Sequence, residues 1–361
     1  KHGIKLVLGY TVEGFKEKDN GVEVLLKDNP SLQADMVVLA IGVTPDTVLA
    51  KEAGLELGIK ESIVVNDRME TSVPDIYAAG DAVQVKHYVT GNDALISLAG
   101  PANKQGRIIA DNICGGDSRY LGSQGSSVIK VFDMTAATTG INETNAKKSG
   151  LEVDTVILSP MSHAGYYPGG KVMTMKVVFE KESYRLLGAQ IIGYEGVDKR
   201  IDVLATAIHA GLNATQLKDL DLAYAPPYSS AKDPVNMSGF MIDNIAKGTL
   251  KQWHLEDMDK ISKDKDVVLL DVRTVGEFSR GHIDGFKNIP VDELRERISE
   301  IEIGKPVYLI CQSGLRSYIA SRILEGNGYE TYNFSGGFRF YDAVVNDRAL
   351  IERAYACGMD Y

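Results

Sequence analysis

Residues 306–317 read PVYLICQSGLRS, a short apolar run followed by a cysteine and a compact turn. The run 307–310 is typical of a buried strand in a parallel sheet. Cys311 stands where this strand ends, and the residues from Ser317 onward have the apolar spacing of a helix. The turn between them must be tight, and Gly314 supplies the backbone freedom that it needs. The stretch therefore predicts a strand, a loop and a helix, with Cys311 at the start of the loop.

The loop has the composition of an anion-binding turn. Successive backbone N–H groups in a tight turn point inward and attract negative charge, and a helix N-terminus adds to this effect. A thiol held there is stabilised as a thiolate, the form that attacks sulfur. We therefore interpret Cys311 and Arg316 as catalytic; the alternative is an inert cysteine buried at a strand end. The substrate-binding groups would be the loop residues Gln312, Ser313, Gly314 and Leu315.

The size of the loop narrows its chemistry. Four residues separate Cys311 from Arg316, one fewer than in the Cys-x5-Arg loop with which phosphatases wrap a whole phosphate. The smaller ring suits one extra sulfur on the cysteine, and it resembles the active-site loop of the rhodanese sulfurtransferases, which carry a cysteine persulfide. Other segments follow the rhodanese signature in order: DVR at 271–273, EF at 277–278, GHIDG at 281–285, NIP at 288–290 and NFSGGF at 333–338. The resemblance implies a rhodanese domain over residues 255–361, in which Asp271 and Arg273 brace the loop.

The amino-acid composition argues against several classes of function. The chain has 361 residues, 44% of them hydrophobic and 24% charged, as expected for a globular protein of several domains. A net charge of −10 argues against a nucleic-acid partner, and no apolar run is long enough to suggest a membrane partner. We predict no metal site and no disulfide framework, which fits a reducing cytoplasm, because the cysteines are only Cys114, Cys311 and Cys357.

A second motif lies at residues 71–82, TSVPDIYAAGDA. A strand predicted at 76–79 would deliver Gly80 and Asp81 to the edge of an open sheet, where ligands bind. The carboxylate could accept a hydrogen bond from a ribose or polyol hydroxyl; the alternative is a turn aspartate that caps the next segment. The motif resembles the second FAD-binding motif of the pyridine-nucleotide disulfide reductases. This implies that Asp81 holds the ribityl chain of FAD, with Gly80, Ala82 and Gly42 close to the cofactor.

The first 124 residues are expected to be parts of two cofactor domains. Strands are predicted at 5–8, 22–26 and 34–41, and the run MVVLAI within the last should be covered on both faces. The resemblance implies that residues 1–45 end an NAD(P)H-binding domain and that residues 46–124 belong to an FAD-binding domain. A helix is predicted after Pro101, on which Asn103 could contact a ligand.

Residues 125–244 predict a compact α+β domain. Four strands are expected at 128–132, 153–158, 172–179 and 186–192, followed by helices at 197–210, 215–220 and 231–246. The arrangement resembles the dimerisation domain of the same reductases, which implies a homodimer. Residues 245–254 are interpreted as a linker to the rhodanese domain.

Two turns rich in tyrosine narrow the family further: HAGYYPG at 163–169 and AYAPPYSS at 223–230. A tyrosine hydroxyl can stabilise a thiolate leaving group or bond a flavin edge; the alternative is aromatic packing in a surface groove. Both turns resemble those of the coenzyme A disulfide reductases, where they meet across the dimer. This implies that Tyr224 lies by the flavin, that Tyr166 lies by the substrate sulfur, and that Lys232 contacts a coenzyme A phosphate, although a lone lysine is more often solvated.

The expected architecture is therefore α/β and α+β multidomain. The fusion resembles FAD-dependent NAD(P)H reductases of coenzyme A disulfide, coenzyme A persulfide or polysulfide that carry a rhodanese cysteine. The chain has neither a Gly-x-Gly-x-x-Gly fingerprint nor the redox cysteine expected near the N-terminus of this family, so we expect it to be the C-terminal part of a longer protein. The alternatives are a non-redox sulfur carrier presenting Cys311, and a flavoprotein that reduces oxygen or peroxide.

Overall fold

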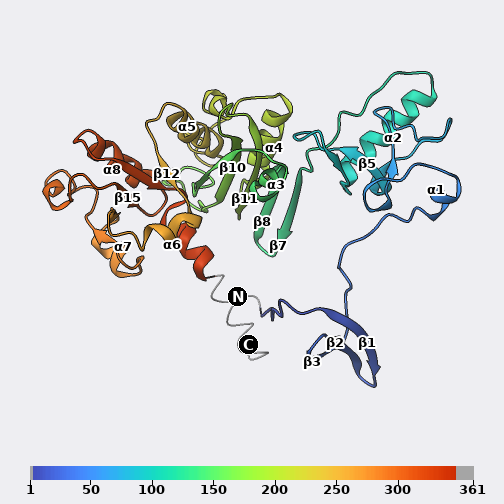
Figure 1. Cartoon of the computed structure of the whole chain (residues 1–361), viewed down its shortest axis with the longest axis horizontal. Helices are drawn as coiled ribbons and strands as arrows, with labels where there is room; N and C mark the ends of the chain where they lie inside the picture. Colours follow the sequence, from blue (N-terminus) through green and yellow to red (C-terminus); the bar gives the residue numbers. More distant parts are fainter. Residues whose placement is uncertain (1–2, 347–361) are drawn as a thin grey trace. The chain divides into compact units, whose positions relative to one another are not determined.

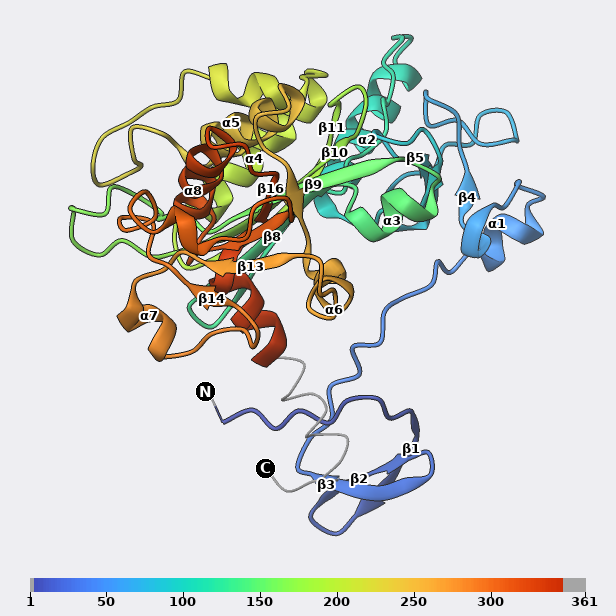
Figure 2. The same cartoon turned by 60° about the vertical axis from the view of Figure 1, so that its left-hand side comes forward.

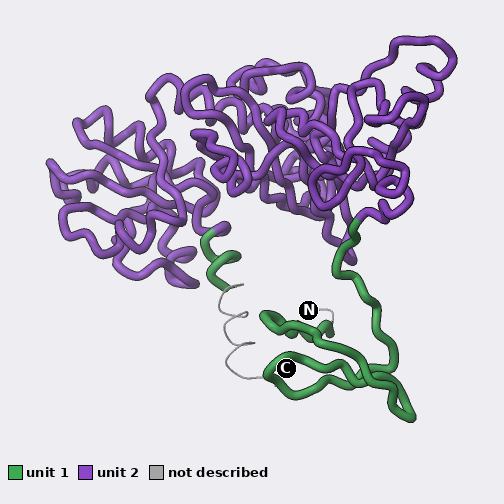
Figure 3. Tube along the Cα trace, turned by 45° about the vertical axis from the view of Figure 1, so that its right-hand side comes forward, with its two compact units in different colours: residues 1–44, 341–361 green, residues 45–340 purple. Residues whose placement is uncertain are grey.

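The computed structural model describes residues 3–346, so Cys357 lies outside the described residues. The elements are shown in Figure 1, and Figure 3 shows two compact units, residues 1–44 with 341–361 and residues 45–340. Within residues 3–346, no helix combines the length and the apolar character that a bilayer crossing needs.

The first unit contains an antiparallel sheet of three strands, in the order β1 (Val12–Lys18), β2 (Gly21–Leu26) and β3 (Asn29–Ala34). The strand predicted at 22–26 is confirmed as β2. The strands predicted at 5–8 and 34–41 are wrong, because residues 5–8 and 36–41 form no strand. Met36 is 76% exposed and Ile41 is 85% exposed. A parallel strand is apolar on both faces only when neighbours cover it, and no strand within residues 3–346 pairs with this run.

Residues 45–124 build a small sheet, β4 (Ile63–Val64), β5 (Val83–Lys86) and β6 (Asp93–Ala94), beside helices α1 (Val48–Glu52) and α2 (Ala99–Ile113). Buried Met69, Val83 and Val85 form its core. The predicted strand at 76–79 is wrong: this segment contributes a single bridge, between Tyr77 and Glu70. The predicted helix is confirmed as α2, although it begins two residues before Pro101.

The middle domain is a five-stranded antiparallel sheet. Its order is β7 (Ser127–Val131), β8 (Met134–Gly140), β11 (Leu186–Gly193), β10 (Thr174–Glu180) and β9 (Val153–Leu158). The four predicted strands are present, but β8 was not predicted because its small residues lack an apolar alternation. Helices α3 (Glu143–Lys148), α4 (Val197–His209) and α5 (Pro234–Ala246) accompany the sheet, and the helix predicted at 215–220 is the 3-10 helix Ala214–Asp219.

The C-terminal domain holds the predicted parallel sheet, which can be followed in Figure 2. The strand order is β12 (Gln252–Trp253), β16 (Thr331–Phe334), β15 (Val307–Ile310), β13 (Val268–Asp271) and β14 (Lys287–Asn288), with every pair parallel. The edge strand β12 lies within the segment predicted as a linker. Helices α6 (Met258–Ile261), α7 (Val275–Ser279) and α8 (Leu315–Glu325) connect the strands. Because parallel strands end at the same edge, the segments that follow β13, β15 and β16 meet there.

Candidate functional site

Cys311 directly follows the central strand β15, as predicted. Gly314 has a φ of +100°, and its N–H donates to the Cys311 sulfur at 3.1 Å. The Ser317 hydroxyl lies 3.2 Å from the same sulfur and 3.1 Å from Gly314 O, so its one hydrogen can be donated to either acceptor. Helix α8 begins at Leu315, two residues earlier than predicted, with Gly314 at its N-cap. The Gly314 N–H, the Ser317 hydroxyl and a helix N-terminus therefore lie around the sulfur, an arrangement that stabilises negative charge.

Cys311 is only 1% exposed, the burial expected of the inert strand-end cysteine that was the alternative interpretation, whereas the Gly314 N–H points at the sulfur as the catalytic interpretation expects. The segment after β16 closes over the loop backbone: Phe338 N–H donates to Cys311 O at 2.8 Å, and Arg339 N–H donates to Gln312 O at 3.1 Å. The approach requires glycine, since a Cβ on Gly337 would lie 2.7 Å from the Ser313 nitrogen. The cysteine is thus held in a tightly bonded loop, with one loop amide aimed at its sulfur.

The two arginines near the loop each have a carboxylate partner. Arg316 donates to both oxygens of Glu277 at 2.7 Å, and this pairing lowers the pKa of Glu277 to about 2. Arg273 forms a buried pair with Asp271 at 2.7 Å, and its guanidinium carbon lies 3.8 Å from the centroid of the Phe338 ring. The predicted bracing role of Asp271 and Arg273 agrees with these contacts, whereas the Glu277 partner of Arg316 was not predicted.

Other contacts at the loop were missed from the sequence. Asn333 donates from its side-chain amide to Gly314 O at 3.1 Å. The Ser335 hydroxyl accepts the N–H of Ile157 in β9 at 3.1 Å, which ties the segment over the loop to the middle domain. Asn333 and Ser335 belong to the segment NFSGGF at 333–338. Because β16 pairs with β15, a side chain at the end of β16 is expected near the loop that follows β15, which is where Asn333 contacts Gly314. Ser317 carried no signal beyond its place in the predicted helix.

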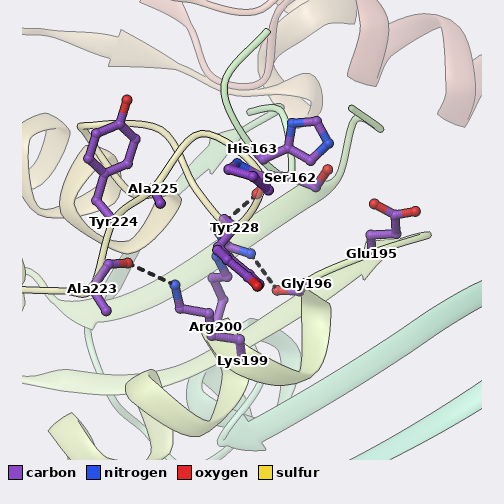
Figure 4. Close-up of a pocket in the computed structure, with 11 residues that line it drawn as sticks. Ser162, His163, Glu195, Gly196, Lys199, Arg200, Ala223, Tyr224, Ala225 and Tyr228 are labelled. Carbon is purple, nitrogen blue, oxygen red and sulfur yellow. Dashed lines mark hydrogen bonds between the residues drawn. The ribbon is translucent and has the colours of Figure 1, made fainter. Parts of the chain in front are cut away.

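A second candidate site is a cavity of about 490 Å³ in the middle domain, shown in Figure 4. The Tyr166 hydroxyl lies 2.9 Å from that of Tyr224, so the two predicted turns meet within one chain. Tyr224 lines the cavity, and its hydrogen bond with Tyr166 raises the pKa of Tyr224 above its ordinary value. The contact with Tyr166 thus favours the protonated form of the Tyr224 phenol.

The base of this cavity is formed by Arg200, which is 1% exposed. Its guanidinium donates to Asp233 at 2.9 Å, to Ser162 O at 3.0 Å and to the Ser229 hydroxyl at 3.1 Å. These bonds hold the 223–230 turn against the domain. The cation on the cavity wall with a part-exposed ammonium group is Lys199, whose Nζ lies 3.3 Å from Ala223 O.

Two predicted ligand residues lie apart from the tyrosine pair. Lys232 lies outside the lining of the cavity, with its Nζ 5.8 Å from the centroid of the Phe240 ring. Asn103 lines a different cavity, of about 710 Å³, and donates to Ala99 O at 2.9 Å within α2. The structure therefore brings Tyr166 and Tyr224 together but not Asn103 or Lys232.

Of the residues predicted to contact FAD, Gly80, Asp81 and Ala82 lie in the unit of residues 45–340. Gly42 lies in the unit that contains residues 1–44. Gly80, Asp81 and Ala82 form a 3-10 helix, and the Gly80 N–H donates to buried Gln105 of α2 at 2.7 Å. Asp81 is exposed, so its carboxylate is open to a ligand hydroxyl, and Gly80 has a φ of +87°. These features fit one polyol contact of FAD. Gly42, with a φ of +93°, belongs to the first unit.

Three family comparisons match consecutive parts of the chain. Residues 1–106 match pyridine nucleotide-disulphide oxidoreductases, and residues 126–234 match the dimerisation domain of that family. Two of the three matches are therefore to parts of one family, the pyridine nucleotide-disulphide oxidoreductases. Residues 254–343 match a rhodanese-like domain, which contains the Cys311 loop. The multidomain α/β and α+β fold predicted from the sequence is confirmed.

The chain is similar to solved structures over most of its length. It is 47% identical to reduced CoADR-RHD from Bacillus anthracis, with a TM-score of 0.90, over 94% of this chain and 60% of the other. It is 40% identical to a NAD-dependent persulfide reductase from A. fulgidus, with a TM-score of 0.82, over 92% and 61% of the two chains. It is also 37% identical to the NAD(P)H sulfur oxidoreductase (CoA-dependent) of Pyrococcus abyssi, over 65% of this chain and 52% of the relative. The chain thus spans about half the length of that relative.

Proposed function

We propose that Cys311 accepts sulfane sulfur as a persulfide, within an FAD-dependent NAD(P)H reductase of coenzyme A persulfide, coenzyme A disulfide or polysulfide. The observation that carries the proposal is the Gly314 N–H, which donates to the Cys311 sulfur at 3.1 Å, with the Ser317 hydroxyl 3.2 Å from the same sulfur. The names of the relatives, which include persulfide and coenzyme A-dependent sulfur reductases, support the reductase part.

The sulfur transfer step needs only this loop and a persulfide donor, R–S–SH. The Cys311 thiolate attacks the outer sulfur, a new sulfur–sulfur bond forms at Cys311, and the donor bond breaks to release R–S⁻. The proton stays on the transferred sulfur. The Gly314 N–H, and the Ser317 hydroxyl when it donates to the sulfur, stabilise the attacking thiolate, and an acceptor thiolate reverses the step.

The cofactor part of the proposal rests on the exposed Asp81 carboxylate and on the tyrosine pair. Asp81 would hold a ribityl hydroxyl of FAD, with Gly80 and Ala82 beside it. FAD, when bound, supplies the transfer of electrons from NAD(P)H to the sulfur substrate. Tyr224 would donate its proton toward a departing coenzyme A thiolate, and Tyr166 would orient the Tyr224 hydroxyl through their 2.9 Å contact.

We also propose a homodimer that acts in the cytoplasm. The dimerisation-domain match and the apolar strand β7 support the dimer, since Val128, Ile129 and Val131 are 58%, 61% and 52% exposed. Cys114 and Cys311 are both free thiols, which supports a reducing compartment.

The test of the proposed function is NAD(P)H oxidation by the full-length natural protein. Coenzyme A disulfide, coenzyme A persulfide, polysulfide and oxygen are compared as electron acceptors, and the flavin absorbance of the purified protein is recorded. We expect a yellow protein that oxidises NAD(P)H faster with a sulfur substrate than with oxygen. Oxygen as the fastest acceptor would favour an oxidase, and a colourless full-length protein would favour a non-redox sulfur carrier.

Tyr224→Phe is expected to slow the NAD(P)H-dependent reduction of coenzyme A disulfide by about tenfold or more, because a positioned proton donor is lost. The free energy of unfolding should stay near that of the wild type, since Tyr224 is exposed and its hydroxyl bonds that of Tyr166, which is also exposed. Steady-state kinetics and urea unfolding check both statements. Tyr194→Phe is the control, because Tyr194 has the same 47% exposure but lies outside the lining of the cavity; an equal loss in both variants would contradict the role of Tyr224.

Gly314→Ala is expected to reduce sulfur transfer by about tenfold and to destabilise the rhodanese-like domain by about 1–2 kcal/mol. The φ of +100° is strained for alanine, and relaxing it turns the N–H away from the Cys311 sulfur. Gly304→Ala is a matched control, since Gly304 has a φ of +88° and, like Gly314, has open space around a Cβ. A thiocyanate assay and urea unfolding should show similar stability losses but a transfer defect only at Gly314. Equal transfer in the two variants would contradict the role of the Gly314 amide.

A further inference from the structure

The segment 335–339 is bonded at one end to the Cys311 loop. Phe338 N–H donates to Cys311 O at 2.8 Å, and Arg339 N–H donates to Gln312 O at 3.1 Å. A peptide unit is planar and trans, so a carbonyl held in one direction aims the N–H of the next residue in the opposite direction. The two bonds therefore set the orientation of the first two peptide units of the loop.

The other end of the segment is bonded to the middle domain. Strand β9 stands at one edge of the five-stranded sheet, and its Ile157 N–H donates to the Ser335 hydroxyl at 3.1 Å. Ser335 is 2% exposed, so this bond is shielded from water and its loss is costly. Ser335 also donates its own N–H to Trp253 O in β12 at 3.0 Å. Ser335 therefore connects β9 and β12 to the segment that closes over the loop.

Close packing leaves the segment little freedom between its two ends. Gly336 and Gly337 have φ values of +96° and +67°, a left-handed conformation in two successive residues. A Cβ on Gly336 would lie 3.0 Å from Cγ2 of Ile157, and a Cβ on Gly337 would lie 2.7 Å from the Ser313 nitrogen. One glycine thus packs against β9 and the next packs against the loop, so a shift of the segment at β9 also displaces it at the loop.

Further side chains hold the two domains together at the same edge. The side-chain amide of Gln252 in β12 donates to Thr155 O at 2.8 Å and to the Asp154 carboxylate at 3.0 Å. His254 Nε2 also lies 3.0 Å from this carboxylate. These contacts fix β9 against the rhodanese-like domain beside the Ser335 bond.

We propose that Ser335 is a positioning residue for sulfur transfer at Cys311. Its bond to β9 holds the segment 335–339, and this segment holds the loop in the shape that aims the Gly314 N–H at the sulfur. The rate of a step in the rhodanese-like domain thereby depends on a strand of the middle domain. The proposal rests on the proposed function of Cys311 as the sulfur acceptor.

The experiment follows single turnovers of the full-length natural protein with glutathione persulfide, measured by the mass of the Cys311 peptide. In Ser335→Ala, we expect the maximal rate of persulfide formation to fall about tenfold, because the nucleophile is displaced. The donor concentration that gives half of this rate should change by less than about twofold, since the surface that meets the donor is kept. An unchanged maximal rate in a folded Ser335→Ala variant would overturn the proposal.

Ser321→Ala is the matched control for loss of a buried hydroxyl. Ser321 is also 2% exposed, but its hydroxyl donates to Tyr318 O within α8 at 2.7 Å. Its maximal rate should stay within about twofold of the wild type. A loss equal to that of Ser335→Ala would show that any buried hydroxyl of the domain has this effect, and would overturn the role of Ser335.

Hydrogen exchange tests the route from Ser335 to the sulfur. The amides of residues 311–316 and 335–339 should exchange faster in Ser335→Ala than in Ser321→Ala, because the segment is released from β9. Slower transfer with unchanged exchange in both segments would show that Ser335 acts by another route, and would overturn the proposal.

Asp154→Ala tests the contribution of β9 and covers the case in which Ser335→Ala does not fold. It removes the acceptor of Gln252 and His254 on the middle domain, so we expect persulfide formation at Cys311 to slow by about threefold or more. The double variant with Ser335→Ala should be no more than about twofold slower than the slower single variant, because both act on one junction.

The control for Asp154 is Asp243→Ala, since Asp243 pairs with Lys218 and Lys247 elsewhere in the middle domain. Its rate of persulfide formation should stay within about twofold of the wild type. A folded Asp154→Ala variant with the wild-type rate would overturn the dependence on the middle domain. A wild type in which Cys311 gains no sulfur would instead contradict the proposed function.

Discussion

Cys311→Ser is expected to reduce sulfur transfer from a persulfide donor by about a thousandfold or more, as loss of a nucleophile does in other covalent catalysts. A serine hydroxyl is not ionised at neutral pH and cannot hold a sulfane sulfur. The substitution is nearly isosteric, and its hydroxyl can still accept the hydrogen bond of the Gly314 N–H, so the loop should keep its shape. Thiocyanate release on addition of cyanide measures the transfer.

The same variant separates the two proposed activities. Reduction of coenzyme A disulfide by the full-length protein should stay within about twofold of the wild type, because that reaction is proposed to use the cavity of Tyr224 rather than the Cys311 loop. Cys114→Ser is the control for thiol loss, since Cys114 is an exposed free cysteine at the end of α2. Persistence of sulfur transfer in Cys311→Ser would contradict the assignment of the persulfide to this residue.

Asp233→Ala is expected to lower the free energy of unfolding of the dimerisation domain by about 3–5 kcal/mol. The substitution leaves Arg200, which is 1% exposed, as an uncompensated buried charge. It also removes the cap on Val235 N–H at 3.0 Å and the acceptor of the Ser229 hydroxyl at 2.7 Å. Urea unfolding followed by far-UV circular dichroism measures the loss.

The control for Asp233 is Lys199→Ala. Lys199 lies 3.8 Å from the same carboxylate but is 35% exposed, so we expect its removal to cost less than about 1 kcal/mol. Similar small losses in the two variants would show that the buried pair is not what stabilises the domain. Because Arg200 also bonds Ser162 and Ser229, the Asp233 variant should in addition reduce the activity assigned to the tyrosine cavity.

The extent to which the sequence predicted the site can be seen in the Cys311 loop. The strand β15, the cysteine at its end and the need for glycine at position 314 all follow from local pattern, because each depends on neighbours in the chain. The partner of Arg316 does not: Glu277 lies 39 residues earlier and reaches the arginine only through the sheet topology and its capping box. The burial of Cys311 likewise depends on the later segment that contains Gly337 and Phe338.

The N-terminal run 36–41 illustrates the opposite case. Its apolar side chains predict a strand that is covered on both faces. The composition of the run does not show whether another strand or a helix is present to cover those side chains. Similarly, the resemblance implied that the two tyrosine turns meet across a dimer, whereas Tyr166 and Tyr224 lie 2.9 Å apart within one chain, and the lysine on the cavity wall beside Tyr224 is Lys199 rather than Lys232. The direction in which the Lys232 side chain points, just after the 223–230 turn, does not follow from its distance from the tyrosines in the sequence.

The role of Cys311 is tested most simply by the mass of the peptide that contains it. The native protein is treated with glutathione persulfide, its remaining thiols are alkylated, and the peptides of Cys311 and Cys114 are compared. We predict that the Cys311 peptide gains the mass of one sulfur atom, that cyanide removes it, and that the Cys114 peptide stays unmodified. An unmodified Cys311 in a sample that releases thiocyanate, or a Cys311 modified only after denaturation, would contradict a persulfide carried in this cradle.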